Sequence, residues 1–196
     1  MDDRRATVER ATTETRVKVS LCLDGPAQAR VATGIGFFDH MLTLLAHHGG
    51  LDLEVTADGD LHVDAHHTVE DAALALGQAL KEAVGDKRGI HRYGSVILPM
   101  DEALVIVSLD LSGRPFYADD LRLHGVHIGD FDGELASHFF QSLAMQAGLT
   151  LHVRLLAGSN AHHIVEAVFK GFARALRQAC LRQEGTQEVP STKGAL

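Results

Sequence analysis

Two runs of five residues, alike in order, restrict the fold of this chain more than any other feature. They are His66-His67-Thr68-Val69-Glu70 and His162-His163-Ile164-Val165-Glu166, and they begin 96 positions apart. If each run opens a helix, residues four apart share one face, whereas adjacent residues point about 100° apart. Each run would then direct its first histidine and its glutamate to one site and its second histidine to another.

The two runs belong to a longer repeat. His40 and His138 lie 98 positions apart, and the segment 51–55 resembles the segment 149–153 at that same offset. A deletion of two residues before Asn160 accounts for the shorter offset of the runs. A repeat of about 95 residues is too long for a solenoid unit and suits two similar half-domains. We therefore predict an internal duplication.

Each half combines apolar alternation, typical of strands, with the apolar period of a helix. The predicted strands are 15–23, 29–33, 51–56, 95–98, 103–111, 121–128 and 149–153, with a turn at 58–60. The predicted helices carry their apolar faces at 38–45, 69–83, 135–143 and 165–179. Asp64 and Asn160 are the predicted N-cap residues of the two long helices. Since each element has one apolar face, we predict an α+β protein in which helices stack on sheets.

The predicted boundaries follow from this repeat. The first half-repeat covers residues 1–93 and the second covers residues 94–183. Residues 184–196, rich in Gly, Pro, Ser and Thr, are predicted to form a C-terminal loop or tail. We expect the three parts to form one compact catalytic unit.

The formal net charge of −8 argues against a nucleic-acid partner, because no basic surface is available for a phosphate backbone. The N-terminus lacks the apolar region of a signal peptide, and no run approaches the roughly 18 apolar residues of a membrane span. We therefore expect a cytoplasmic protein without membrane contact. Cys22 and Cys180 make no disulfide framework and are expected to be small, mostly buried residues.

Histidine and glutamate in paired runs indicate metal binding, because neutral imidazole and carboxylate suit Mn, Fe, Zn or Ni. If one ion takes the first histidine and the glutamate of one run, the repeat suggests that the second histidine of the other run joins them. The two predicted sets are His66, Glu70, His138 and His163, and His162, Glu166, His40 and His67. An octahedral ion would keep two positions open in each set, as a catalytic site requires.

Seven runs, two of which contain the paired runs above, are spread along nearly the whole chain and carry a specific resemblance. They are Gly34–Leu42, Asp64–Asp71, Asp101–Leu104, Leu111–Pro115, His138–Leu143, Asn160–Ala167 and Pro190–Gly194. Together they closely resemble the imidazoleglycerol-phosphate dehydratases of histidine biosynthesis.

The resemblance implies a fold, a cofactor and an assembly. The family is a duplicated βα protein whose helices pack between two mainly antiparallel or mixed four-stranded sheets, similar to domain 2 of ribosomal protein S5. It uses two Mn²⁺ per active site, with other divalent metals as alternatives, and forms a homo-oligomeric octahedral shell of 24 subunits with active sites between subunits. By resemblance, one Mn²⁺ takes His40, His67, His162 and Glu166, and the other takes His66, Glu70, His138 and His163.

The resemblance also implies a reaction. The family removes water from D-erythro-1-(imidazol-4-yl)glycerol 3-phosphate and forms 3-(imidazol-4-yl)-2-oxopropyl phosphate. By resemblance, Glu14 is the acid/base residue that shuttles protons. The expected substrate-binding residues, with the cations directed at the phosphate, are Glu14, Arg92, Arg114, Lys170, Thr192, Lys193 and Gly194. We see no fused phosphatase domain and expect the monofunctional form of the family.

Two other functions remain open from the residues alone. A binuclear metallohydrolase acting on a small phosphate ester would use two ions to activate water, and it would release phosphate. A dehydratase would instead form a keto phosphate without free phosphate. A non-catalytic metal-holding shell protein would lose metal in Glu70→Ala and keep any activity it has.

Overall fold

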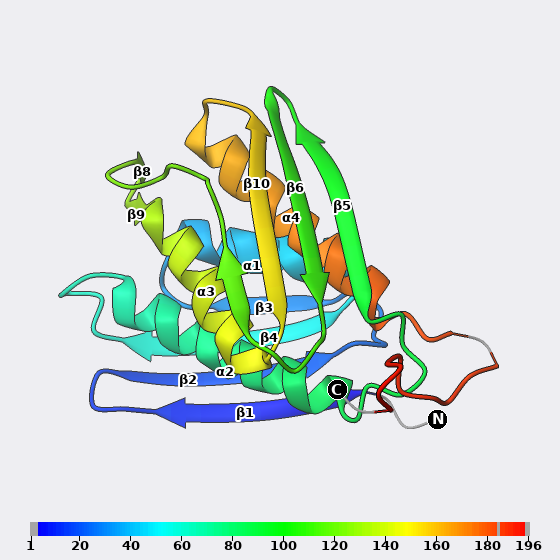
Figure 1. Cartoon of the computed structure of the whole chain (residues 1–196). Helices are drawn as coiled ribbons and strands as arrows, with labels where there is room; N and C mark the ends of the chain where they lie inside the picture. Colours follow the sequence, from blue (N-terminus) through cyan, green and yellow to red (C-terminus); the bar gives the residue numbers. More distant parts are fainter. Residues whose placement is uncertain (1–3, 184, 195–196) are drawn as a thin grey trace.

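The structure is a computed structural model that describes residues 4–183 and 185–194. The outer ends of the predicted first half and of the predicted tail, residues 1–3, 195 and 196, lie outside the described residues, as does residue 184. In the described part of the chain, helices lie between two four-stranded sheets, so the predicted α+β architecture is confirmed (Figure 1). No helix in the described ranges combines the length and the apolar character that spanning a bilayer requires.

The two sheets share one strand order. The first contains β1 (Arg5–Ala11), β2 (Thr15–Cys22), β3 (Ala29–Ala32) and β4 (Asp52–Gly59), in the order β1-β2-β4-β3. The second contains β5 (Tyr93–Met100), β6 (Ala103–Asp110), β7 (Phe116–Ala118) and β10 (Thr150–Ala157), in the order β5-β6-β10-β7. β3 is parallel to β4 and β7 to β10, whereas the other neighbours are antiparallel. The duplication and its boundaries at 93 and 183 stay predictions.

The helices that fill the space between the sheets are α1 (Gly36–Gly49), α2 (His66–Val84), α3 (Glu134–Ala147) and α4 (Ala161–Cys180). α1 and α2 pack on the first sheet, and α3 and α4 pack on the second. The two layers meet where α2 packs on α3 and where α1 packs on α4. Phe140 of α3 and Phe169 of α4 are fully buried, with ring centroids 4.7 Å apart, and this aromatic contact helps to join the two helices.

The sequence pattern explains these layers. In β6, Ala103, Val105, Val107 and Leu109 are buried and alternate with partly exposed residues, so one face of the strand turns toward the helices. Gly94 allows β5 to lie close to α4, because a Cβ atom at this position would collide with the carbonyl oxygen of Ala175. The long helix of the second half therefore rests directly on its sheet.

All the predicted helices are present. Asn160 is the N-cap of α4, and its side chain accepts hydrogen bonds from the backbone amides of His162 and His163. The predicted cap of α2 is wrong by one residue, because Ala65 occupies the N-cap position. Asp64 still supports this end, since its Oδ1 accepts a hydrogen bond of 2.8 Å from the His66 amide.

Some strand predictions need correction. Residues 121–128 form a loop apart from the two residues of β8 (His127–Ile128), which pairs with β9 (Phe131–Asp132). Leu121 and Leu123 are buried although they lie in a loop, and their spacing of two residues gives the same apolar alternation as a strand. Residues 58 and 59 belong to β4 rather than to a turn. β1 and β7 were not predicted, because both are edge strands with little buried apolar alternation.

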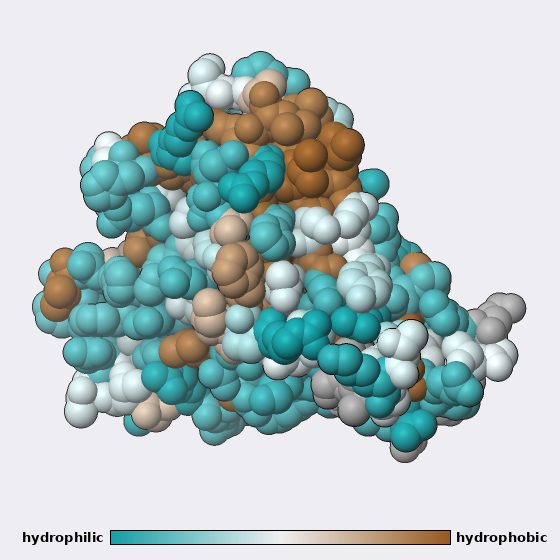
Figure 2. Space-filling model, in the orientation of Figure 1, coloured by the Kyte–Doolittle hydropathy of each residue, from teal (hydrophilic) through white to brown (hydrophobic). Residues whose placement is uncertain are grey.

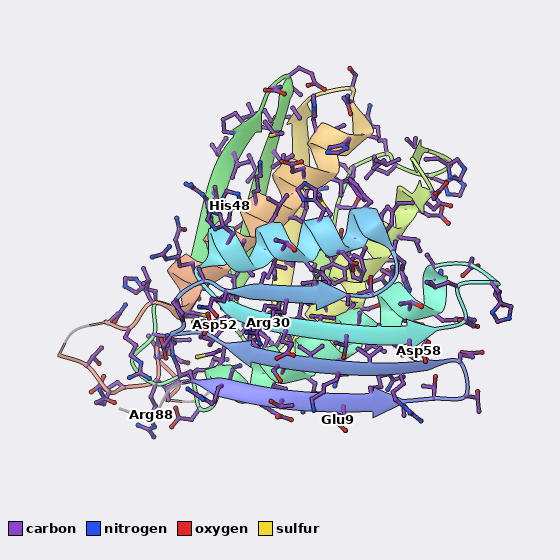
Figure 3. All side chains as sticks on the ribbon, turned by 180° about the vertical axis from the view of Figure 1, so that it is seen from behind. Glu9, Arg30, His48, Asp52, Asp58 and Arg88 are labelled. Carbon is purple, nitrogen blue, oxygen red and sulfur yellow. The ribbon has the colours of Figure 1, made fainter. Side chains whose placement is uncertain are left out.

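The outer faces of the two sheets differ. The first sheet presents charged residues, among them Glu9, Arg30 and Asp58, on the side away from α2 (Figure 3). The second sheet presents an apolar outer patch, which consists of Ile97, Pro99, Leu104 and Ile106. Figure 2 shows apolar side chains gathered over the upper part of this sheet. Ile97 is 64% exposed, an unusual position for an apolar side chain with apolar neighbours.

The two cysteines partly match the expectation. Cys180 is buried, whereas Cys22 is half-buried on β2. Both are free cysteines.

Candidate metal centre

Three residues from two helices form the first candidate site, which we name the α1–α4 group: His40, His162 and Glu166. His162 and Glu166 lie one turn apart at the start of α4, and His162 Nε2 is 3.1 Å from Glu166 Oε2. His40 of α1 brings its Nε2 to 3.7 Å from the same oxygen. One ligand atom from each residue lies within 4.8 Å of the others, so a single ion could contact all three.

The second candidate site, the α2–α3 group, consists of His66, Glu70 and His138. His138 Nε2 lies 3.6 Å from Glu70 Oε1, and the ring centroids of His66 and His138 are 4.4 Å apart. Burial, followed by the charge of His66, lowers the pKa of His138 and favours the neutral ring that binds metals. His138 Nε2 is buried and has no hydrogen-bond partner among the described residues. A metal ion would satisfy this atom.

The glutamate of the α1–α4 group is followed four residues later by a lysine, whereas no cation stands at the corresponding position after Glu70 in the α2–α3 group. Lys170 Nζ lies 2.6 Å from Glu166 Oε1, and the side chain of Glu166 is only 9% exposed. Burial acts to raise the pKa of Glu166, but the hydrogen bond and charge of Lys170, together with His162 and His40, outweigh it and hold this pKa below its usual value. The glutamate is therefore ready to act as an anionic ligand.

His67 and His163, the fourth members of the predicted sets, lie outside both groups within one chain. His67 Nδ1 is 3.0 Å from Asp60 Oδ2, and His163 Nδ1 is 2.7 Å from Glu102 Oε2. These carboxylates raise the pKa of both rings, chiefly through the hydrogen bonds. Adjacent residues of a helix point in different directions, so neither ring can reach the group on its own helix.

A hollow of about 670 Å³ opens beside the α2–α3 group. Its walls include His66, Phe37 from α1 and Glu134 from the start of α3. Phe131 also lines it, with its ring centroid 5.2 Å from that of Phe37. This volume lies within the range of small-molecule sites, so a ligand could reach His66 from this side.

The two predicted phosphate-binding arginines lie together, away from the α1–α4 group. Arg92 pairs with Asp110 at 2.7 Å and donates a hydrogen bond of 2.8 Å to the carbonyl oxygen of Pro190. Arg114 Nη2 lies 3.9 Å from the same aspartate, and its side chain is 73% exposed. Pro190 begins the run that contains Thr192, Lys193 and Gly194. Arginines and tail thus gather at one end of the molecule, which we name the cationic end.

The cationic end and the α1–α4 group cannot meet within one chain. The Arg92 amide donates to the carbonyl oxygen of Ala179 in the last turn of α4, whereas His162 lies in the first turn. Seventeen residues of helix separate these points, or roughly 25 Å at 1.5 Å per residue. Figure 1 shows α4 running behind the second sheet, with its first turn at the upper left and its last turn at the lower right. Lys170 is the predicted cation that does lie beside a metal group.

Sequence reasoning overlooked three residues at these sites. Asp60 and Glu102 accept hydrogen bonds from the two turned-aside histidines. Lys87 lies near Arg92 and Arg114. Burial is the main cause that lowers the pKa of Lys87, and the charges of the two arginines add to it. Glu102 lies in the family-like run 101–104, which is a signal that could have been used. The other two follow no spacing rule, because tertiary contacts bring them to the site.

Comparisons with known proteins agree with the predicted resemblance. The family model for imidazoleglycerol-phosphate dehydratase matches residues 33–176. The chain is 54% identical to the imidazoleglycerol-phosphate dehydratase of Desulforamulus reducens and 56% identical to that of Desulfitobacterium hafniense. Each comparison extends over 196 residues and covers 100% of both chains.

Two crystal structures share the fold. Imidazoleglycerol-phosphate dehydratase from Staphylococcus aureus is 38% identical with a TM-score of 0.83, covering 91% of this chain and 99% of that one. The Pyrococcus furiosus enzyme in complex with (S)-C348 is 40% identical with a TM-score of 0.83, covering 96% and 100%. Sequence, fold and paired histidine–glutamate groups lead to one conclusion. The chain belongs to the imidazoleglycerol-phosphate dehydratase family.

Proposed function

We propose that this chain dehydrates D-erythro-1-(imidazol-4-yl)glycerol 3-phosphate to 3-(imidazol-4-yl)-2-oxopropyl phosphate in histidine biosynthesis, and that it works in the cytoplasm. The observation that carries the proposal is the pair of groups, each with two histidines and one glutamate, in a chain that resembles these dehydratases over its full length. An imidazole substrate has two ring nitrogens, and the two groups supply one metal position for each.

We propose that each group holds one Mn²⁺, or another divalent ion of similar preference. The α1–α4 group would be completed by His67 and the α2–α3 group by His163. Because both rings point away from the groups of their own chain, these ligands come from neighbouring copies. Bound at the two ring nitrogens, the ions would stabilise the negative charge that the imidazole ring carries once its N–H proton has left, and those electrons could expel the hydroxyl on the carbon attached to the ring.

Glu14 is the proposed acid/base residue. Its side chain is 51% exposed, and Oε2 lies 3.7 Å from His67 Nδ1, which is too long for a hydrogen bond. The carboxylate is therefore close to a proposed metal ligand and still free to exchange protons with a substrate. It would take the proton from the second carbon of the side chain and give a proton to the hydroxyl that leaves the first carbon, which is attached to the ring.

The phosphate of the substrate would be bound by cations. We assign this role to Arg92, Arg114, Lys170 and Lys193, helped by the Thr192 hydroxyl and the Gly194 amide. The phosphate is a dianion near neutral pH, and guanidinium groups can bind its oxygens in pairs. Since the cationic end lies roughly 25 Å from the α1–α4 group of its own chain, the site would combine the cationic end of one copy with the metals of another.

These requirements support a closed homo-oligomer, and we propose the octahedral shell of 24 subunits that the family resemblance implies. The apolar outer patch on the second sheet offers a surface that such an assembly would bury. Ile97 lies opposite Ile106 across the β5–β6 pair, and Pro99 lies opposite Leu104. Burying each such side chain is worth about 2 kcal/mol.

The test is turnover by protein loaded with Mn²⁺. We expect the keto phosphate to form without release of inorganic phosphate, and we expect two Mn²⁺ per chain by elemental analysis. His67→Ala should remove one ion per chain and abolish dehydration. Release of phosphate would favour a metallohydrolase, and a fully active His67→Ala variant with both ions bound would contradict the proposed ligand set.

A further inference from the structure

The two histidines that turn away from the metal groups are held in the same manner, although they belong to different halves. Both place Nδ1 against a carboxylate, His67 against Asp60 at 3.0 Å and His163 against Glu102 at 2.7 Å. In both rings Nε2 is then the nitrogen available to a metal. Asp101 Oδ2, on a side chain that is 71% exposed, lies 3.6 Å from Nε2 of His163.

The surroundings of Asp60 suggest that it serves His67. Its side chain is 16% exposed, and its Oδ1 is buried without a hydrogen-bond partner among the described residues. A carboxylate in this state costs free energy, because one oxygen has lost its water without gaining a donor. The hydrogen bond from His67 to the other oxygen is the contact that accounts for its position.

Glu102 serves His163 from a different element. It lies in the turn between β5 and β6, and its Oε1 accepts hydrogen bonds from the amides of Asn160 at 2.9 Å and Ser159 at 3.4 Å. The hydrogen bond from His163 is the main cause that lowers the pKa of Glu102 to about 2. One ionised carboxylate therefore joins the ring of His163 to the segment that begins α4.

We propose that Asp60 and Glu102 are positioning residues for the metal ligands His67 and His163. Each carboxylate accepts a hydrogen bond from Nδ1–H, which selects the tautomer with a lone pair on Nε2 and fixes the plane of the ring. The inference rests on the proposed metal-dependent function, since each Nε2 would complete a metal group of a neighbouring copy. Carboxylate, histidine and metal would then lie in a row at both sites.

This arrangement explains why Glu14 is not bound to His67. Glu14 lies in the turn between β1 and β2, the counterpart of the turn that carries Glu102 in the second sheet. In the second half the turn residue itself holds the histidine. In the first half Asp60 takes the hydrogen bond, which leaves Glu14 at 3.7 Å and free to move protons. The hydrogen bond from the turned-aside histidine is therefore accepted by the residue after β4 in the first half and by the turn between β5 and β6 in the second.

The test measures Mn²⁺ affinity by calorimetric titration, in two backgrounds that leave one group each. Glu70→Ala leaves the group that takes His67, and Glu166→Ala leaves the group that takes His163. In the first background we expect Asp60→Asn to weaken Mn²⁺ binding by about 10- to 100-fold. In the second it should change the affinity by less than about threefold, because the sites are separate. Glu102→Gln should show the reverse pattern.

Asp58→Asn is the matched control, because Asp58 is an exposed carboxylate on β4, two residues from Asp60. It should leave Mn²⁺ affinity unchanged in both backgrounds. Asp60→Glu, which keeps a carboxylate, should recover part of the affinity that Asp60→Asn loses. An equal loss at both groups, together with a lower unfolding midpoint, would indicate a general structural role and overturn the proposal.

The failure of this inference can be told apart from the failure of the proposed function. If His67→Ala loses the metal site and Asp60→Asn keeps full affinity, the positioning role is wrong and the ligand assignment stands. If His67→Ala itself keeps the site, the ligand assignment is wrong.

Discussion

The α1–α4 group and the α2–α3 group have the same composition and helical spacing, yet they balance charge differently. Glu166 has Lys170 four residues later, at 2.6 Å, whereas the residue four positions after Glu70 is Leu74. The side chain of Glu166 is 9% exposed, and that of Glu70 is 40% exposed. Similar ligand sets can therefore hold their negative charge in two ways, through an internal cation or through contact with solvent.

The two halves also differ in the side chains that surround a shared backbone arrangement, outside the metal groups. They share a strand order, but the first sheet has a charged outer face, whereas the outer face of the second carries the apolar outer patch. The equivalent positions in β1 and β5 are Ala6 and Gly94, which pair with Leu21 and Leu109. A common topology thus carries two different sets of neighbours. Each difference can be tested by exchanging or removing one side chain.

The largest effect is expected when one glutamate is removed from its group. Glu70→Ala and Glu166→Ala should each lose one Mn²⁺ per chain and lower the dehydration rate by about 10³-fold, because several kcal/mol of charge stabilisation disappear. Elemental analysis and a keto phosphate assay measure both effects. Glu54→Ala, on the outer face of the first sheet, is the control. Normal turnover in one of the two variants would show that the groups are not equivalent in function.

A smaller effect should follow from adding one methyl group to β5. Gly94→Ala should destabilise the protein by about 3 kcal/mol, because the new Cβ would collide with the Ala175 carbonyl and force α4 away from the sheet. The reverse change at the matched position, Ala6→Gly, should cost about 1 kcal/mol. Denaturant unfolding of the metal-free protein compares the two. Equal costs would mean that the long helices lie equally close to their sheets.

The outer faces should differ in their effect on assembly. Ile97→Glu should weaken subunit association by about 2 kcal/mol per contact, or about 30-fold, because a charge would enter the apolar outer patch. Thr56→Glu, at an exposed position on β4 of the first sheet, should leave assembly unchanged. Light scattering over a range of protein concentrations measures both. A native mass that Ile97→Glu does not alter would remove the second sheet from the proposed interface.

Sequence patterns predicted the elements whose signals are local. The apolar period and the caps at Asn160, Gly50 and Gly148 belong to the helices themselves, so all four described helices were found. β1 and β7 escaped because edge strands bury little and need no alternation. The loop at 121–128 resembles a strand in its sequence because its buried leucines contact the core at alternate positions.

The composition of the candidate site and the division of its histidines were predicted, but the contacts that hold His67 and His163 were not. The repeat indicated which histidines and glutamates belong together, and the structure gathers three residues of each set in one chain. The repeat in the sequence could not show that His67 and His163 turn to Asp60 and Glu102, because those contacts depend on how loops and turns pack. The difference between Lys170 and Leu74 is visible in the sequence, but its meaning depends on the burial of Glu166.

The smallest expected effect concerns this lysine. Lys170→Leu copies the residue found beside the α2–α3 group and would leave Glu166 without its cation. Burial would then raise the pKa of Glu166 against the weaker opposition of His162 and His40 alone, so protons would compete with Mn²⁺ at a higher pH than in the native protein. At pH 8 the carboxylate would be ionised and free of its competing lysine. We therefore expect about tenfold tighter Mn²⁺ binding at pH 8 and weaker binding near pH 5.5.

Titrations at both pH values, in a Glu70→Ala background, isolate the α1–α4 group. The control is Lys18→Leu, which removes an exposed lysine of the first sheet and should change neither affinity. Substrate affinity is measured separately, because Lys170 is also a proposed phosphate ligand. If Lys170→Leu weakened Mn²⁺ binding at both pH values, the lysine would support the bound ion rather than compete with it. The two groups would then differ by a stabilising residue, and the charge comparison would have to be reversed.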